Sequence, residues 1–314
     1  MDLYIVTSSI IVMGIMILLG VLTALRVEIT SDLKAGLMFI ILNIAVPSII
    51  LNGVFNTEIT SHILNQVILI FMISIMYHLA GLLVAWLLAR LFGFQSLFAK
   101  KMTILAALGN SGFIGIPLCA TIFGPIGGLL AAIFDAALDL IIFSVVIYML
   151  QSNGRFQMKH LKALINPPLL AITFGLIAAS TGIEAPNIVK QLTEMLSSIA
   201  GPLAMLYIGM LIPPLIKKRG FTIFPQLWFP ITLRLLLIPI LVIIIITNSP
   251  LNELTRNLII ILSSMPTFML VTVIFSKYTQ DEETAIITTI YSTILCLLTI
   301  PLISFFSSWW ESFV

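Results

Sequence analysis

The sequence contains few charged residues. Asp, Glu, Lys and Arg make up 9% of its 314 residues, whereas hydrophobic residues make up 60%. A soluble protein carries roughly 25% charged residues, because its surface must remain hydrated. A chain with so little charge cannot cover a water-facing surface. We therefore predict an integral membrane protein of the all-α class.

Cysteine and histidine are also scarce, and their positions exclude further classes. Cys119 and Cys296 both lie inside apolar runs, which offers neither a disulfide framework nor a cysteine-rich metal site. The three histidines are scattered, without the spacing of a zinc motif. A net charge of +2 leaves no basic patch for nucleic acid. We expect no cofactor apart from a coupling Na⁺ or H⁺, and no nucleic-acid partner.

Ten apolar stretches are each long enough to cross a hydrocarbon core, which needs about 20 residues. They lie in two groups of five, at residues 3–25, 33–51, 63–91, 102–123 and 127–150, and at 164–181, 196–216, 224–246, 254–275 and 284–306. The first stretch lacks the basic start and cleavage site of a signal peptide, so we expect it to be a membrane span. Five crossings invert the second group relative to the first, which is the topology of an inverted repeat. We predict repeats at 1–150 and 164–314, joined by a linker at 151–163.

Lys and Arg are concentrated in alternate loops. One side carries the basic loop 217–219 and further basic residues at 90, 100 and 101, whereas the opposite loops hold only Lys190 and Arg256. Cytoplasmic loops carry the excess of Lys and Arg in membrane proteins. The linker is therefore predicted to be cytoplasmic and both termini extracellular or periplasmic, in a multi-pass protein of the cell (plasma or inner) membrane.

Two predicted spans contain residues that disfavour a continuous helix. The fourth includes Gly109-Asn110-Ser111-Gly112-Phe113-Ile114-Gly115-Ile116-Pro117, and the ninth includes Ser263-Ser264-Met265-Pro266-Thr267. Glycine and proline weaken helices, and unwound backbone in a bilayer survives only inside protein or beside a wet cavity. We expect each proline to begin a new half-helix, where its missing N–H is not needed. The alternative is a pair of proline kinks with local hydroxyl hydrogen bonds.

Two half-helices that meet in the membrane would direct their N-termini at one point. Free N–H groups and the positive end of the helix dipole attract an anion such as a carboxylate. Hydroxyl and amide side chains near the breaks would add donors, and Asn43 in the second span would face the substrate from the other side. The predicted substrate-binding residues are Asn43, Asn110, Ser111, Gly112, Pro117, Ser263, Ser264, Pro266 and Thr267.

Three charged residues lie in the middle of predicted spans, where each costs about 2.5–3.5 kcal/mol. Asp135 and Asp139 are four residues apart in the fifth span and share one helix face, and Arg234 lies in the eighth. Two close carboxylates cannot both ionise cheaply, so one holds a proton or attracts a cation. One hypothesis is that the pair binds a coupling H⁺ or Na⁺, while Arg234 attracts the anion or neutralises an Asp. The other is a static ion pair between the fifth and eighth spans.

The fourth span carries a motif with a family resemblance. Asn110-Ser111-Gly112-Phe113-Ile114-Gly115-Ile116-Pro117-Leu118 resembles the fourth-helix motif of the auxin efflux carrier family, which includes plant auxin exporters and bacterial permeases for malate and malonate. The stretch from Ser264-Met265-Pro266 through Phe275-Ser276-Lys277-Tyr278 to Ile300-Pro301-Leu302 is similar to the family's C-terminal signature. With the ten-span layout, the resemblance covers essentially the whole chain, and the short linker resembles the compact bacterial members.

The resemblance implies a fold of two inverted five-helix repeats, like that of bile acid, arsenite and riboflavin transporters. Spans 1, 2, 6 and 7 would form a scaffold that also makes a homodimer, and spans 3–5 and 8–10 a moving transport domain. The broken fourth and ninth helices would cross at Pro117 and Pro266, and Asn110 takes the position of the family's substrate-contacting asparagine. The implied function is secondary transport of a small carboxylate, such as malate, malonate or an auxin-like acid, by an elevator motion.

An intramembrane serine protease is an alternative of a different class. Gly109-Asn110-Ser111-Gly112 matches the Gly-x-Ser-Gly of rhomboid proteases, and His78 lies at similar depth. Rhomboid proteases place their catalytic histidine after the serine, however, and no membrane histidine follows Ser111. A passive anion channel is a second alternative, although it would need a continuous polar lining, which the apolar spans do not show. We therefore predict a carrier and no enzyme.

Overall fold

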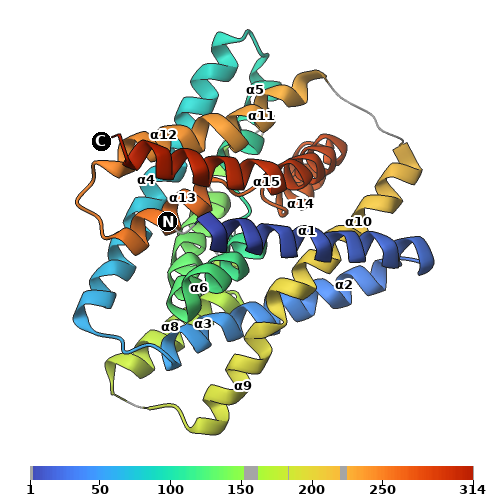
Figure 1. Ribbon diagram of the computed structural model, residues 1–314. Helices are drawn as coiled ribbons and strands as arrows, with labels where there is room; N and C mark the ends of the chain where they lie inside the picture. The colour runs from blue at the N-terminus through green and yellow to red at the C-terminus, as the bar shows by residue number, and fades with distance from the viewer. Residues whose placement is uncertain (1–2, 152–161, 183, 220–224, 314) are drawn as a thin grey trace.

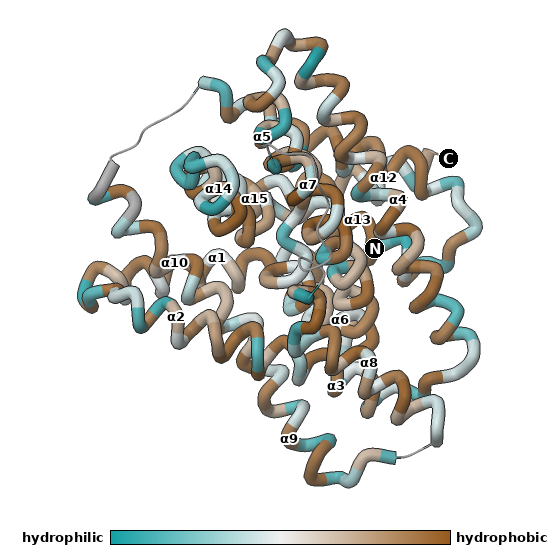
Figure 2. Tube along the Cα trace, turned by 180° about the vertical axis from the view of Figure 1, so that it is seen from behind, coloured by the Kyte–Doolittle hydropathy of each residue, from teal (hydrophilic) through white to brown (hydrophobic). Residues whose placement is uncertain are grey.

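The computed structural model describes residues 3–151, 162–182, 184–219 and 225–313, and every regular element in them is a helix. Seven helical stretches there are long and apolar enough to cross a membrane, and α8 (Pro167–Ser180) is a shorter apolar helix. Hydrophobic residues line these helices, and hydrophilic residues gather at their ends (Figure 2). The protein is an all-helical, multi-pass membrane protein, as the composition predicts.

The seven long stretches are built from single helices or from helices in series (Figure 1). Three are α1 (Leu3–Arg26), α4 (Ser61–Leu91) and α15 (Glu282–Glu311). The other four combine several elements. The first joins α2 (Ser31–Ile40), η1 (Ile41–Ala45) and α3 (Val46–Phe55), and the second joins η2 (Ser111–Gly115), α6 (Ile116–Ile141), η3 (Ile142–Val146) and α7 (Ile147–Leu150). The third joins α9 (Asn187–Ser198) and α10 (Ala200–Arg219), and the fourth joins η5 (Pro225–Leu227), α11 (Trp228–Thr232), η6 (Leu233–Leu237) and α12 (Ile238–Thr247). The remaining helices are α5 (Ser96–Ala107), α13 (Glu253–Ser263) and α14 (Val271–Tyr278).

Three π-helical turns, η1, η2 and η6, each precede a proline by two residues. Proline has no N–H, and its ring clashes with the carbonyl four residues earlier. The preceding turn therefore widens, and the N–H just before the proline bonds five residues back, as the Ile116 N–H does to the Ser111 carbonyl.

The interruptions predicted for the fourth and ninth spans are present. The chain leaves helical structure between Ala107 and Ser111, and again between Ser263 and Val271. The expectation that each proline begins the next half-helix is wrong. Asn110 caps the first of these helices, so it starts six residues before Pro117, and Pro266 stays in the unwound segment.

The predicted fourth and fifth spans are joined by a tight reversal of the chain. Gly124 has φ +72° and ψ −167°, a conformation that glycine adopts without the penalty of a side chain, and Pro125 follows it. The chain turns back at this point, because Ser111 and Ala120 before it lie against Asp135 and Gly128 after it. In the second half, α9 is an additional helix before the predicted seventh span, which sequence reasoning missed.

The helices pack by close contacts between small residues. α1 lies against α10, α3 against α6, α8 and α9, and α4 against α5 and α6. At the α1–α10 crossing, a Cβ on Gly20 would overlap the Leu206 carbonyl, and one on Gly209 would overlap the Ile17 carbonyl. Small residues let membrane helices approach in this way and gain van der Waals contact.

Candidate functional site

The two interrupted segments cross inside the protein. The Asn110 N–H donates to the Pro266 carbonyl at 2.7 Å, and the Phe268 N–H donates to the Leu108 carbonyl at 3.2 Å. The segments thus run antiparallel and form one bridge, between Gly109 and Thr267. These bonds satisfy unwound backbone that has no water to bind in a membrane.

The crossing differs in position from the one that the resemblance implies. Pro266 takes part through its carbonyl, but Pro117 does not, because the bridge lies eight residues earlier, at Gly109. Pro117 lies instead next to α10. A Cβ added to Gly201 of that helix would be 3.6 Å from the Cβ of Pro117. The crossing therefore lies at Gly109 and Thr267 and involves only the second of the two predicted prolines.

Three of the predicted donor side chains are hydrogen-bonded within the protein. The hydroxyls of Ser263 and Ser264 both donate to the Ile260 carbonyl at 2.8 Å, and the Thr267 hydroxyl donates to the Leu105 carbonyl at 3.0 Å. This differs from the expectation that these hydroxyls donate to a ligand. They bond to backbone carbonyls near the ends of α13 and α5 instead.

Asn110 keeps an unused donor. Its Oδ1 accepts a hydrogen bond from the Phe113 N–H at 3.2 Å and caps η2, whereas its Nδ2 has no partner, although the residue is only 4% exposed. A buried donor without a partner costs about 1–3 kcal/mol. Next to it, the first N–H groups of η2 have no intrahelical acceptor. The amide and the helix start together can bind a negatively charged oxygen.

A carboxylate of the protein already lies at this helix start. The Ser111 hydroxyl donates to Asp135 Oδ1 at 2.7 Å, and a Cβ added to Gly112 would be 2.5 Å from Asp135 Oδ2. Glycine at position 112 therefore makes room for the carboxylate. The positive end of the helix dipole favours a negative charge here.

Asp139 faces a small pocket together with Asp135. Asn166 Nδ2 donates to Asp139 Oδ2 at 2.9 Å, and Asn166 Oδ1 accepts from the Leu169 N–H and caps α8. The pocket leaves about 20 Å³ for the centre of a water molecule, which is enough for one water or a small cation. Its lining comes from α6 and from the start of α8: Ile116, Ala132, Asp135, Ala136, Asp139, Leu164, Asn166, Pro168, Leu169 and Ile172.

Arg234 is fully buried in η6, and it binds backbone carbonyls. Its Nε donates to Met265 O at 2.8 Å, its Nη1 to Ala107 O at 2.9 Å and its Nη2 to Ser263 O at 2.6 Å. Among the described residues, neither Asp135 nor Asp139 forms an ion pair. Both predicted pairings of Arg234 with an Asp are therefore wrong. The carbonyls at helix C-termini lack partners and carry the negative end of the dipole, so they accept the guanidinium instead.

A family model for membrane transport proteins, the auxin efflux carrier family, matches residues 4–160 and 154–304. The chain belongs to the auxin efflux carrier family. It is 26% identical to an uncharacterized transporter of Methanothermobacter thermautotrophicus over 94% of this chain and 96% of that protein. It is 25% identical to an uncharacterized transporter of Methanocaldococcus jannaschii over 84% of this chain and 86% of that protein. The resemblance of its motifs is confirmed, and the protein is a membrane transporter.

The serine and histidine of the protease alternative do not pair in the structure. Ser111 donates to Asp135. His78 Nδ1 lies 2.7 Å from the Ser74 carbonyl and 3.2 Å from the Ser74 hydroxyl on its own helix, and that hydroxyl donates to the Phe134 carbonyl at 2.6 Å. A catalytic serine needs its base within hydrogen-bond reach. The contacts of Ser111 and His78 therefore favour the transporter class over the protease alternative.

Sequence reasoning missed Asn166 as a partner of Asp139. A signal was present, because Asn166-Pro167-Pro168 combines an N-cap residue with prolines in the first helical turn. Of the remaining predicted residues, Asn43 lies in η1, and its Nδ2 donates to the Phe39 carbonyl at 3.0 Å. Its amide donor is thus used within its own helix.

Proposed function

We propose that the protein is a secondary transporter of a small organic anion whose carboxylate binds at the crossing of the two interrupted segments. The observation that carries this proposal is the buried, unpartnered Nδ2 of Asn110 beside the start of η2. A carboxylate there would receive one amide hydrogen bond and the first backbone N–H groups of the helix. Malate, malonate and auxin-like acids all carry the required group.

Asp135 links anion binding to a cation. A substrate carboxylate at the start of η2 would approach the Asp135 carboxylate, which Ser111 holds at that helix end. Two neighbouring carboxylates repel each other unless one carries a proton or a cation. The pocket beside Asp135 and Asp139 has room for a small cation or a water. We therefore assign the coupling H⁺ or Na⁺ to this pair.

The proposed architecture comprises two inverted repeats, at residues 1–150 and 164–314, with a cytoplasmic linker at 151–163. Spans 1, 2, 6 and 7 form a scaffold that dimerises, and spans 3–5 and 8–10 form the moving domain of an elevator. The packing of α1 on α10 and of α3 on α8 supports the first group, and that of α4 on α5 and α6 the second. We place the protein in the cell membrane with both termini outside.

Uptake of radiolabelled malonate or malate into proteoliposomes tests the proposed function. We expect saturable uptake that a proton or sodium gradient accelerates. Asn110→Ala should lower the uptake by at least about tenfold, since a hydrogen bond to a charged group contributes about 1.5–3 kcal/mol. Asp135→Asn should abolish the response to the gradient.

Asn52→Ala is the matched control, because it also removes a buried asparagine, on α3, whose Oδ1 accepts from Asn56. This variant should retain the uptake. Equal uptake by the Asn110→Ala and wild-type proteins would overturn the site. Uptake that rises linearly with concentration would identify the channel alternative, and peptide hydrolysis would identify the protease.

A further inference from the structure

The guanidinium of Arg234 lies where two half-helices end. Ala107 and Ser263 are the last residues of α5 and α13, and their carbonyls both accept hydrogen bonds from Arg234. Met265 O and, at 3.5 Å, Leu262 O complete its acceptors. Carbonyls from both interrupted segments therefore surround one positive charge.

Such a set of carbonyls is a cation site in its own right. The final carbonyls of a helix have no intrahelical donor and carry the negative end of the dipole. In transporters with discontinuous helices, unwound carbonyls and half-helix C-termini bind the coupling Na⁺ or H⁺. In this protein, a side chain takes the place of the ion.

We propose that Arg234 is a tethered cation that occupies a cation site made by the carbonyls of Ala107, Ser263 and Met265. Its fixed charge holds the ends of α5 and α13 together, so the crossing needs no free metal ion at this position. Cation coupling is then confined to Asp135 and Asp139. Arg234 is a positioning residue, since its hydrogen bonds in the described part of the chain reach neither Asn110 nor Asp135 but hold the two segments that cross at Gly109 and Thr267.

The local geometry is built around a guanidinium. Its rigid planar fork reaches carbonyls in several directions at once, which the point charge of a lysine does not. Gly109 faces it directly, because a Cβ there would be 2.8 Å from Arg234 Nη2 and 3.0 Å from Cζ. Gly109 is not among the described residues with positive φ, so the space beside Arg234 and not the backbone conformation requires a glycine.

Chemical rescue of the purified protein tests this inference. Arg234→Ala leaves a void beside the carbonyls, whereas Arg234→Met fills most of it with an uncharged chain. Both should lower the apparent melting temperature by roughly 10 °C. Guanidinium chloride at roughly 20 mM, far below denaturing concentrations, should restore at least half of the loss in Arg234→Ala and none in Arg234→Met. Sodium chloride at the same concentration should restore less.

A destabilised Arg234→Ala that guanidinium does not rescue would overturn the inference, as would an Arg234→Met with the melting temperature of the wild type. If Arg234→Ala does not fold, Arg234→Lys and Arg234→Gln decide the matter. Lysine keeps the charge and should retain clearly more stability than glutamine. Equal stability of the two variants would show that the charge is not required.

The melting temperature requires no substrate, so this test is independent of the proposed anion. Asn110→Ala, which leaves the carbonyl set intact, should show no response to guanidinium at the same concentration. Failure of anion uptake in the wild type would overturn the proposed function and leave the cation site standing.

Discussion

Glycine at position 112 determines how closely a carboxylate approaches the start of η2. A Cβ there would be 2.5 Å from Asp135 Oδ2 and 3.0 Å from its Cγ, so Gly112→Ala should push the carboxylate away from Ser111. We expect this variant to lose most of the gradient-driven anion uptake, because the carboxylate leaves the helix end that it shares with the substrate. Uptake of labelled malonate under a proton or sodium gradient measures the effect.

Gly81→Ala is the control for this substitution. A Cβ on Gly81 would have its nearest neighbour, the Ala107 Cβ, at 3.7 Å, which is an ordinary contact. Its uptake should equal that of the wild type. A fully coupled Gly112→Ala variant would contradict the role assigned to Asp135.

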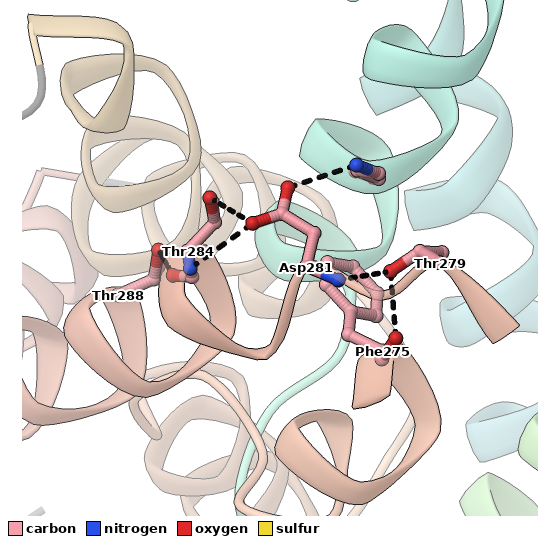
Figure 3. Close-up of polar contacts among 6 residues, drawn as sticks. Phe275, Thr279, Asp281, Thr284 and Thr288 are labelled. Atoms are coloured by element: carbon pink, nitrogen blue, oxygen red, sulfur yellow. Dashed lines mark hydrogen bonds and ion pairs between the residues drawn. The ribbon is translucent and has the colours of Figure 1, made fainter. Parts of the chain in front are cut away.

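Asp281 makes the stability of one end of the protein depend on pH. Its Oδ2 accepts from Lys101 Nζ on α5 at 2.8 Å, and its Oδ1 accepts from the Thr284 hydroxyl at 2.8 Å and caps α15 (Figure 3). Burial alone would raise the pKa of Asp281, but the hydrogen bonds from Lys101 and Thr284 outweigh it and hold the pKa below its usual value. Folding therefore gains stability above the unfolded pKa of about 4 and loses it as the pH falls through the lower folded pKa.

Asp281→Asn should reduce the loss of stability at acidic pH. We expect the variant to be less stable than the wild type at neutral pH, and the difference between them to shrink below about pH 4. Melting temperatures of both proteins between pH 3 and pH 7 provide the measurement. A constant difference across that range would contradict the role of the ionised carboxylate.

At the scale of elements, one residue at the start of α8 both stabilises that helix and contacts the carboxylate pair. Asn166 caps α8 through Oδ1 and donates to Asp139 through Nδ2. Asn166→Ala removes both contacts and should lower stability by about 1 kcal/mol. Asn166→Ser keeps a capping side chain but removes the amide donor, so it should remain near wild-type stability and still lose coupled transport. If Asn166→Ser transports normally, the donor to Asp139 has no role in coupling.

The interruptions could be predicted from glycine and proline, but the points where helices restart could not. Pro117 follows a π-turn that its own ring induces, and the cap that starts the helix is Asn110, seven residues earlier. The hydrogen-bond partners of Arg234 could not be predicted from the sequence either. The sequence shows an arginine and two aspartates within spans, whereas the actual acceptors are backbone carbonyls that only the crossing brings together.

At the scale of the whole molecule, α3 and α6 meet at a contact that a moving domain would slide over. A Cβ on Gly53 would be 2.6 Å from the Pro125 carbonyl oxygen and 2.8 Å from the Leu129 Cβ, neither of which moves easily. Gly53→Ala should therefore separate the two helices at a cost of about 1–3 kcal/mol and lower transport several-fold. Binding of malonate, measured by thermal shift, should persist.

Gly36→Ala provides the contrast, since nothing lies within 4 Å of the added Cβ on α2. Alanine should stabilise that helix by about 0.5–1 kcal/mol and leave transport unchanged. If both variants behave alike, the α3–α6 contact has no special role in the motion.

Composition and span length were sufficient to predict a multi-pass helical protein, because they depend on no tertiary contact. Of the predicted substrate-binding residues, Asn110 alone has an amide that the structure leaves buried and unpartnered, whereas hydroxyls such as that of Thr267 are bonded to carbonyls. Side-chain type predicts the capacity to donate, and only the fold decides which donors stay free.

The position of a bound carboxylate tests the proposed anion site most directly. A cryo-EM or crystal structure with bromomalonate would locate the ligand by its bromine atom. We predict a carboxylate within hydrogen-bond distance of Asn110 Nδ2 and of the first N–H groups of η2. A ligand bound elsewhere, with Asn110 Nδ2 still without a partner, would contradict this site.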